Sequence, residues 1–209
     1  FDHAIKIYAK ALKVNPNFAA AQTNMDNAVE EKAEIDKLVA DYARIAKLEI
    51  GSAEIVSFTG TLLRARGYLD AAIESYKQAI KIKPDYAEAY NNMGNALKDK
   101  GELDAAIDNY KQAIKIKPDY AEAYSNMGNV LKEKGELDAA IDSYKQAIKI
   151  KPDYAEAHRH LSTVKKYNFA DEQITQMKFL YADQKLENDR KCHLCFALAK
   201  ASEDLGDFQ

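Results

Sequence analysis

The sequence predicts an all-α fold, a right-handed superhelical solenoid of antiparallel helix pairs. Three observations lead to this prediction. A 34-residue segment recurs along the chain, each copy carries two apolar runs at helical spacing, and the 209 residues include only 4 prolines and 8 glycines. A repeat of this length forms a fold in which each unit packs on its neighbours, so the chain is not expected to have one globular core.

The repeat is clearest in residues 87–120 and 121–154, which differ at four positions. These differences are Asn91 to Ser125, Ala96 to Val130, Asp99 to Glu133, and Asn109 to Ser143. Residues 53–86 form a third copy, which is looser in its first half and ends in the same YKQAIKIKPDY. Three regular repeats are therefore predicted over residues 53–154.

Each copy is predicted to form two antiparallel helices, because its apolar residues recur three and four positions apart. The first helix of residues 87–120 places on one face Tyr90, Met93, Gly94 and Leu97. The second helix does the same with Leu103, Ala106, Tyr110, Ala113 and Ile114. The turn falls at Lys100-Gly101-Glu102, and Pro118 ends the second helix because proline disfavours α conformation in the residue before it.

The flanking segments fit the repeat less well. Residues 1–18 match a second helix alone, with Ala4, Tyr8, Ala11 and Pro16 in the expected places. Residues 19–52 keep the length of a repeat but are degenerate. No helix breaker occurs near the expected turn at residues 32–34, so residues 19–49 form either a hairpin or one helix of about 45 Å, and both alternatives stay open.

The C-terminal segment, residues 155–209, is predicted to form divergent helices of the same kind. It starts a repeat with His158 and Leu161, and the periodicity then fails between Tyr167 and Asp189. Residues 192–209 resume a first helix, which ends in the turn signal of residues 205–208.

These segments resemble the tetratricopeptide repeat. The matching positions are Tyr90, Met93, Gly94, Leu97, Ala106, Tyr110, Ala113 and Pro118, with equivalents 34 residues later. Within that family the segments are similar to the repeats of O-GlcNAc transferase and of bacterial proteins that join such repeats to a sulfotransferase domain. Stacked helix pairs of this kind form a superhelix whose concave groove is lined by the first helices. The expected function is a protein–protein interaction module that binds a peptide or partner segment in that groove.

The candidate site consists of first-helix side chains that point away from the apolar face. Glutamates follow one edge, amides and hydroxyls the centre, and basic residues the other edge. The predicted peptide-binding residues are Ser57, Thr61, Asn91, Asn92, Asn95, Lys98, Ser125, Asn126, Asn129, Lys132, Arg159 and Thr163. Because an Asn side chain both donates and accepts, a regular row of Asn can hold the backbone of an extended peptide. Phe58 and His160 interrupt this row, and the alternative is that individual Asn side chains bond neighbouring turns while the charges are solvated.

Some tetratricopeptide domains hold a C-terminal carboxylate with Lys, Asn and Arg from three successive first helices. This sequence has Ser57, Asn91 and Ser125 where that clamp needs lysine, although Asn95 and Asn129 are present. The clamp is therefore not expected.

Other candidate chemistry is weaker. Cys192 and Cys195 form a CxxC motif on the last predicted helix, and both are interpreted as packing residues with Cys195 facing the core. Most of the 13 tyrosines are assigned to the core, and the KQAIKIK blocks to a solvated outer face. No Gly-rich phosphate loop, serine nucleophile motif or His-Glu metal helix occurs, so no enzyme activity, cofactor or metal is predicted.

Charge and apolar content exclude further classes of partner. The net charge of -3 provides no basic field for nucleic acid, and no apolar run reaches the roughly 18 to 20 residues of a membrane span. Two cysteines cannot form the disulfide framework of a secreted fold, and this favours a reducing, cytoplasmic location.

The two ends of the chain are the two halves of one repeat. Residues 192–207 supply a first helix and residues 1–18 a second helix, and the faces expected to be bare carry Leu194, Leu198 and Leu205 at one end and Ile5, Tyr8 and Leu12 at the other. Head-to-tail association would cover both faces. A self-assembling scaffold is therefore one alternative function, and the targeting or substrate-recognition region of a larger transferase is another.

Overall fold

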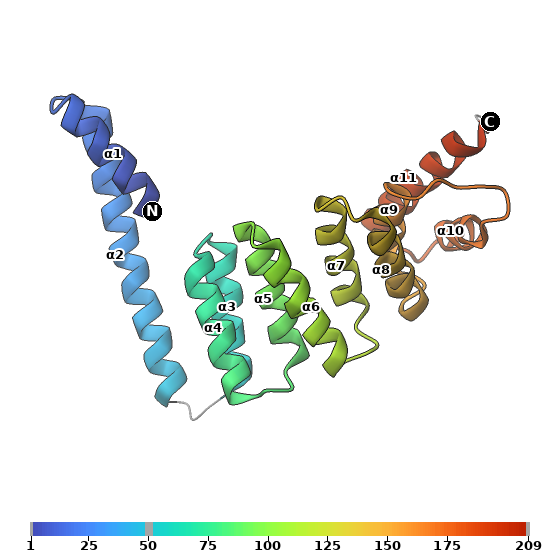
Figure 1. Ribbon diagram of the computed structural model, residues 1–209, viewed down its shortest axis with the longest axis horizontal. Coiled ribbons are helices and arrows are strands. Elements are labelled where there is room, and N and C mark those ends of the chain that lie inside the picture. The colour runs from blue at the N-terminus through green and yellow to red at the C-terminus, as the bar shows by residue number, and fades with distance from the viewer. Residues whose placement is uncertain (1, 49–51, 208–209) are drawn as a thin grey trace.

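Helices stacked side by side make up the structure, a computed structural model that describes residues 2–48 and 52–207 (Figure 1). Within these residues the chain has eleven helices and no strand, so the predicted all-α solenoid is confirmed. Of the predicted features, Phe208 and residues 49–51 lie outside the described residues.

The three regular repeats form three helix pairs. Their first helices are α3 (Ala53–Ala65), α5 (Ala87–Lys100) and α7 (Ala121–Glu133). Their second helices are α4 (Leu69–Ile82), α6 (Leu103–Ile116) and α8 (Leu137–Ile150). Each first helix packs most extensively on its own second helix, and each second helix also contacts the next first helix. This packing joins the repeats into one continuous core.

A tyrosine and a glycine set the distance between the two helices of a repeat. Tyr110 on α6 is fully buried, and a Cβ added at Gly94 on α5 would lie 2.7 Å from its Cε1 atom. The missing side chain therefore lets the ring lie directly on the backbone of α5. At the turn between the same helices, Gly101 has a φ of 85°, a left-handed conformation that glycine adopts without strain and that ends α5.

The N-terminal part consists of two helices, α1 (Asp2–Val14) and α2 (Ala19–Leu48), which pack on each other. Of the two arrangements left open for residues 19–49, the described residues have the continuous one. Because a helix rises about 1.5 Å per residue, the 30 residues of α2 span about 45 Å. Contacts between α2 and α3 are few, and in Figure 1 the α1–α2 pair stands apart from the regular stack.

The C-terminal part contains α9 (Ala155–Ser162), α10 (Glu172–Ala182) and α11 (Asn188–Leu205). Helix α11 runs parallel to α9, as two contacts show. Arg190, near the start of α11, pairs with Asp153, just before α9. Asp204, near the end of α11, accepts a hydrogen bond from the backbone N–H of Tyr167, which follows α9. This direction is that of a further first helix. Helix α10 and the loop before it occupy the intervening region and supply Met177 and Tyr167 to a separate small core.

This second core corrects the expectation of a bare C-terminal face. Leu194 was predicted to be exposed, but it is buried among Ala155, Tyr167 and Met177, and Leu198 and Leu205 are partly covered. Residues 167–189 lack the helical periodicity of the repeats, so their packing over α11 could not be predicted from the sequence pattern.

Candidate functional site

The concave wall is formed by α3, α5, α7 and α9. Successive first helices contact one another, α3 with α5, α5 with α7 and α7 with α9, whereas contacts between successive second helices are weaker. Elements on the inside of a curved stack lie closer together than those on the outside, so the first helices line the inner side. This is the wall on which the predicted binding residues lie.

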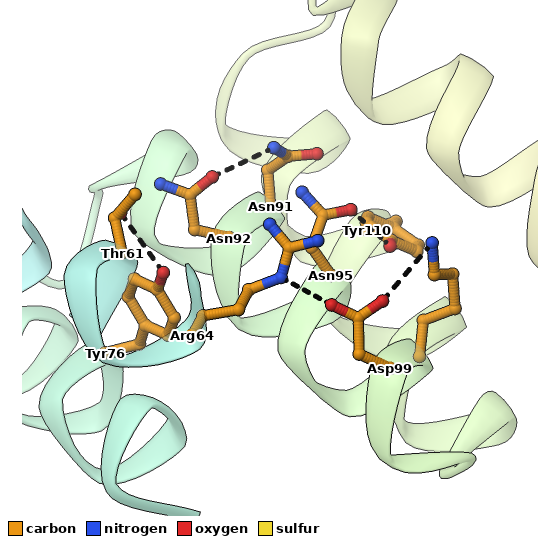
Figure 2. A network of polar contacts seen from close by, with 9 residues as sticks. Thr61, Arg64, Tyr76, Asn91, Asn92, Asn95, Asp99 and Tyr110 are labelled. Atoms are coloured by element: carbon orange, nitrogen blue, oxygen red, sulfur yellow. Dashed lines mark hydrogen bonds and ion pairs between the residues drawn. The ribbon is translucent and has the colours of Figure 1, made fainter. Parts of the chain in front are cut away.

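A recurring hydrogen bond connects this wall to the core. In each regular repeat the hydroxyl of the buried tyrosine donates to the polar side chain that follows the packing glycine. Figure 2 shows this bond in the first two repeats. The three pairs are Tyr76 to Thr61 at 3.2 Å, Tyr110 to Asn95 at 2.8 Å and Tyr144 to Asn129 at 2.8 Å. The central positions of three successive repeats are therefore held by the same device.

The hydrogen bond from the tyrosine hydroxyl orients the side-chain amides of Asn95 and Asn129. Because the Tyr110 hydroxyl occupies Oδ1 of Asn95, the Nδ2 group lies on the other side of the amide, as Figure 2 shows. Burial raises the pKa of Tyr110, so its hydroxyl stays protonated and remains a donor. Asn129 has the same bond, so in both half-buried amides the tyrosine occupies the oxygen and not the N–H donors.

Three predicted binding residues lie elsewhere than expected. Ser57, Asn91 and Ser125 are buried, with 3%, 5% and 1% of their surface exposed. They occupy equivalent positions in successive repeats, and their burial shows that they do not face the groove. Asn91 contacts the next first helix directly. Asn126 on α7 donates to Asn91 on α5 at 3.0 Å, and Asn91 donates to Asn92 at 3.4 Å.

The first-helix glutamates Glu54, Glu88 and Glu122 form ion pairs at one edge of the wall. In the three regular repeats each glutamate pairs with the lysine that follows its own second helix, and that lysine also lies over a tyrosine ring. The pairs are Glu54 with Lys83 at 3.2 Å, Glu88 with Lys117 at 3.7 Å and Glu122 with Lys151 at 3.3 Å. The rings are those of Tyr86, Tyr120 and Tyr154, with centroids 4.8 to 4.9 Å from the lysine nitrogens. These carboxylates are therefore engaged within the fold.

The basic residues along the other edge of the wall, Arg64, Lys98 and Lys132, differ in their ion pairs. Arg64 pairs with Asp99 of the next first helix at 2.7 Å, and Lys98 pairs with the same carboxylate at 3.4 Å (Figure 2). Lys132, the equivalent residue of α7, makes no ion pair within the described residues. Asp99 is a site residue that the sequence did not single out.

The last part of the wall lies on α9 and α11. Arg159 is exposed, and its NH1 atom lies 3.3 Å from Nδ1 of His193 on α11. Thr163 follows the last turn of α9, and its hydroxyl donates to the His160 carbonyl at 2.7 Å. Burial, together with the charges of Lys132 and Arg159, lowers the pKa of His160 to about 4.

The CxxC motif lies beside this region. Cys192 and Cys195 are both exposed, so the prediction that Cys195 faces the core is wrong. The buried stripe of α11 is formed instead by Leu194, Ala197 and Ala201, because the small C-terminal core covers that side. Within the described part of the chain, no group of three or more His, Cys, Asp or Glu residues is placed to hold a metal ion, and no helix is long and apolar enough to span a membrane.

Comparison with known proteins identifies the repeats. A family model described as "TPR repeat" matches residues 60–101, 94–135 and 128–162 in succession. No curated protein sequence matches the chain significantly. The crystal structure of MamA is similar with 27% sequence identity and a TM-score of 0.58, covering 84% of this chain and 91% of that one.

Two further solved structures share the fold. The first TPR domain of Spaghetti (RPAP3), bound to the HSP90 peptide SRMEEVD, has 21% identity and a TM-score of 0.52 over 54% of this chain and 90% of its own. A mutant O-GlcNAc transferase of Thermobaculum terrenum has 23% identity and a TM-score of 0.53 over 62% of this chain. The match covers 25% of the transferase chain.

Proposed function

Since residues 60–162 of this chain are tetratricopeptide repeats, we propose that it acts by binding an extended segment of a partner protein in the concave groove. The row of Thr61, Asn95 and Asn129 is the observation that carries the proposal. These side chains recur once per repeat, and the two amides direct N–H donors away from the core. Backbone carbonyls recur along any polypeptide, so such a row can bind a segment largely independently of its sequence.

The fold and the composition of the wall support binding as the role of these residues. One solved protein of this fold holds a peptide, although at 21% identity that likeness concerns the fold alone. Apart from the exposed ring of Phe58 on α3, the exposed parts of the wall offer amides, hydroxyls and charged groups, which suit hydrogen bonds to a polypeptide. The likeness to a transferase is also one of fold, so a role as the recognition region of a larger transferase remains a separate proposal.

Site-specific crosslinking tests where the partner binds. A photoreactive side chain at Asn92, on the concave wall, is expected to crosslink to one contiguous segment of a captured partner. The matched control is the same group at Gln112, which is exposed on α6. Crosslinks from Gln112 and none from Asn92 would place the partner on the convex side.

A variant with alanine at Asn92, Asn95, Asn126 and Asn129 tests the row itself. We expect weaker binding of that partner segment with unchanged helical content. These side chains are half-buried and hydrogen-bonded, so a modest loss of stability is also expected. Unchanged affinity in titration calorimetry would exclude the amide row as the contact surface.

Head-to-tail self-association is a second candidate function. Helix α11 exposes Cys192, Cys195 and Phe196, the face on which a regular first helix carries its second helix, and Tyr8 on α1 is half-exposed. However, Phe196 occupies the position of the packing glycine of the regular repeats, so its ring would clash with the Tyr8 ring of a second copy. If α1 of another copy does pack there, Phe196→Gly should strengthen association in light scattering over a wide concentration range. A monomer at all concentrations, in both proteins, would exclude this function.

A further inference from the structure

The positive charges of the concave wall are balanced at one end and unbalanced at the other. On α3 and α5, Arg64 and Lys98 share the carboxylate of Asp99. On α7 the equivalent cation is Lys132, and it forms no ion pair within the described residues. Glu133, which follows it, is exposed and likewise makes no ion pair there. The ion pairs that neutralise the basic residues of the first two repeats therefore have no equivalent in the third.

The next first helix adds a second cation without a carboxylate. The guanidinium carbon of Arg159 lies 5.1 Å from the ring centroid of Phe196, and NH1 contacts His193. A guanidinium has five N–H donors in one plane, and stacking on a ring leaves that plane open at its edges. Within the described part of the chain, no carboxylate lies within ion-pair distance of Arg159. Its remaining donors are therefore available to a ligand.

Groups around His160 show how closely these charges gather. Its ring lies 5.6 Å from that of Tyr144 on α8, and it is affected electrostatically by Lys132 on α7, by Arg159 beside it and by His193 on α11. The acidic group acting on it in the opposite sense is Glu156. In the two preceding repeats the equivalent residue is a neutral asparagine.

We propose that this end of the concave wall binds an acidic stretch of the partner segment, with Lys132 and Arg159 as the charged contacts. The inference rests on the proposed groove binding and adds the chemistry of the ligand. Lys132 and Arg159 lie on successive first helices and both act electrostatically on His160, so two or more carboxylate side chains along one segment suit them better than a single chain terminus. The net charge of -3 means that this attraction is local and does not come from the whole protein.

Two matched peptides test the proposal by fluorescence anisotropy at low salt. One alternates glutamate with glycine, the other replaces each glutamate by glutamine, and both are amidated so that no terminal carboxylate is present. We expect the glutamate peptide to bind more tightly. In Lys132→Gln/Arg159→Gln its affinity should fall about tenfold, the combined effect of two partly exposed ion pairs, while the glutamine peptide is unaffected.

The control variant is Lys115→Gln/Lys149→Gln, which removes the same charge from exposed positions in the last turns of α6 and α8. It should bind the glutamate peptide like the unmodified protein. An equal loss in this control would overturn the proposal, because the attraction would then be non-specific. Equal affinity for the two peptides would also overturn it, but would leave groove binding intact.

Two other outcomes are decisive. If neither peptide binds, the acidic preference is wrong and the groove proposal loses support with it. If a single-stranded oligonucleotide binds more tightly than the glutamate peptide and competes with it, the cations recognise phosphate, and the assignment to an acidic polypeptide fails.

Discussion

Replacing Tyr110 by Phe separates the structural role of the tyrosine from its effect on the groove. The ring stays packed on Gly94, and the hydroxyl that donates to Asn95 at 2.8 Å is removed. A hydrogen bond of this kind contributes about 1 kcal/mol to stability. Since Asn95 is half-buried, water can reach the freed carbonyl, and we expect a loss of about 1 kcal/mol without a larger desolvation penalty.

The effect on binding follows from the orientation of the amide. With the hydroxyl present, Asn95 directs Nδ2 away from Tyr110, whereas without it the amide has two orientations of similar energy. Only one presents the donor, so the competent fraction falls to about one half and the affinity of a groove ligand falls about twofold. Substituting all three buried tyrosines multiplies this factor for the two amides, and Thr61 contributes less because its hydroxyl rotates freely.

The assay compares urea denaturation and peptide titration for Tyr110→Phe and for a control, Tyr124→Phe. Tyr124 is half-buried, and no hydrogen bond of its hydroxyl is found among the described residues. The control should change neither stability nor affinity appreciably. If Tyr110→Phe lowers stability but leaves affinity for every groove ligand unchanged, the tyrosines do not orient the wall, and the reasoning behind the amide row is refuted.

Three further predictions concern packing, pH and shape. Gly94→Ala should destabilise the protein by about 2 kcal/mol in the same denaturation assay, since its Cβ would lie 2.7 Å from a fully buried ring. Gly101→Ala has open space around it but a φ of 85°, so it should destabilise the protein by about 1 kcal/mol. Because burial lowers the pKa of His160 to about 4 from an ordinary 6.5, the unfolded chain takes up a proton that the folded chain does not, so stability should fall as the pH drops from 6.5 towards 4. His160→Asn should be less sensitive to this change in urea denaturation at pH 7 and pH 5. Spin labels at Gln22 and Lys47 should lie about 38 Å apart by dipolar spectroscopy, since 25 residues of one helix separate them, and a short distance would mean that α2 folds back.

The regular repeats were predictable because each carries its own complete set of signals. Helical spacing identifies the two faces, Gly101 and Pro118 mark the ends, and the 34-residue period removes ambiguity about register. The tyrosine–amide bond also had a visible signal. A spacing of 15 residues separates Asn95 from Tyr110 and recurs in the neighbouring repeats, but its meaning depends on how closely the two helices pack.

Contacts between repeats were harder to predict. On an isolated helix Ser57, Asn91 and Ser125 lie on the polar side, so the sequence placed them in the groove. In the stack this position is buried, and at Asn91 it contacts the next first helix. The same limitation explains Cys195, because the face of α11 that is buried depends on a segment without periodicity. Local patterns identify a helix face, but neighbouring elements decide what covers it.

Identical repeats would form a groove with no preferred direction, but single residues give this wall a polarity. One aspartate, Asp99, neutralises the basic residues of the first two regular repeats, and no equivalent pairing follows at Lys132. One substitution at that end, Arg159 for a small polar residue, then adds a positive charge to the same side. A bound segment would therefore meet amides on α5 and α7 and a cationic region at one end only. The amides hold the backbone in either direction, and the charges favour the direction that brings acidic side chains to α7 and α9.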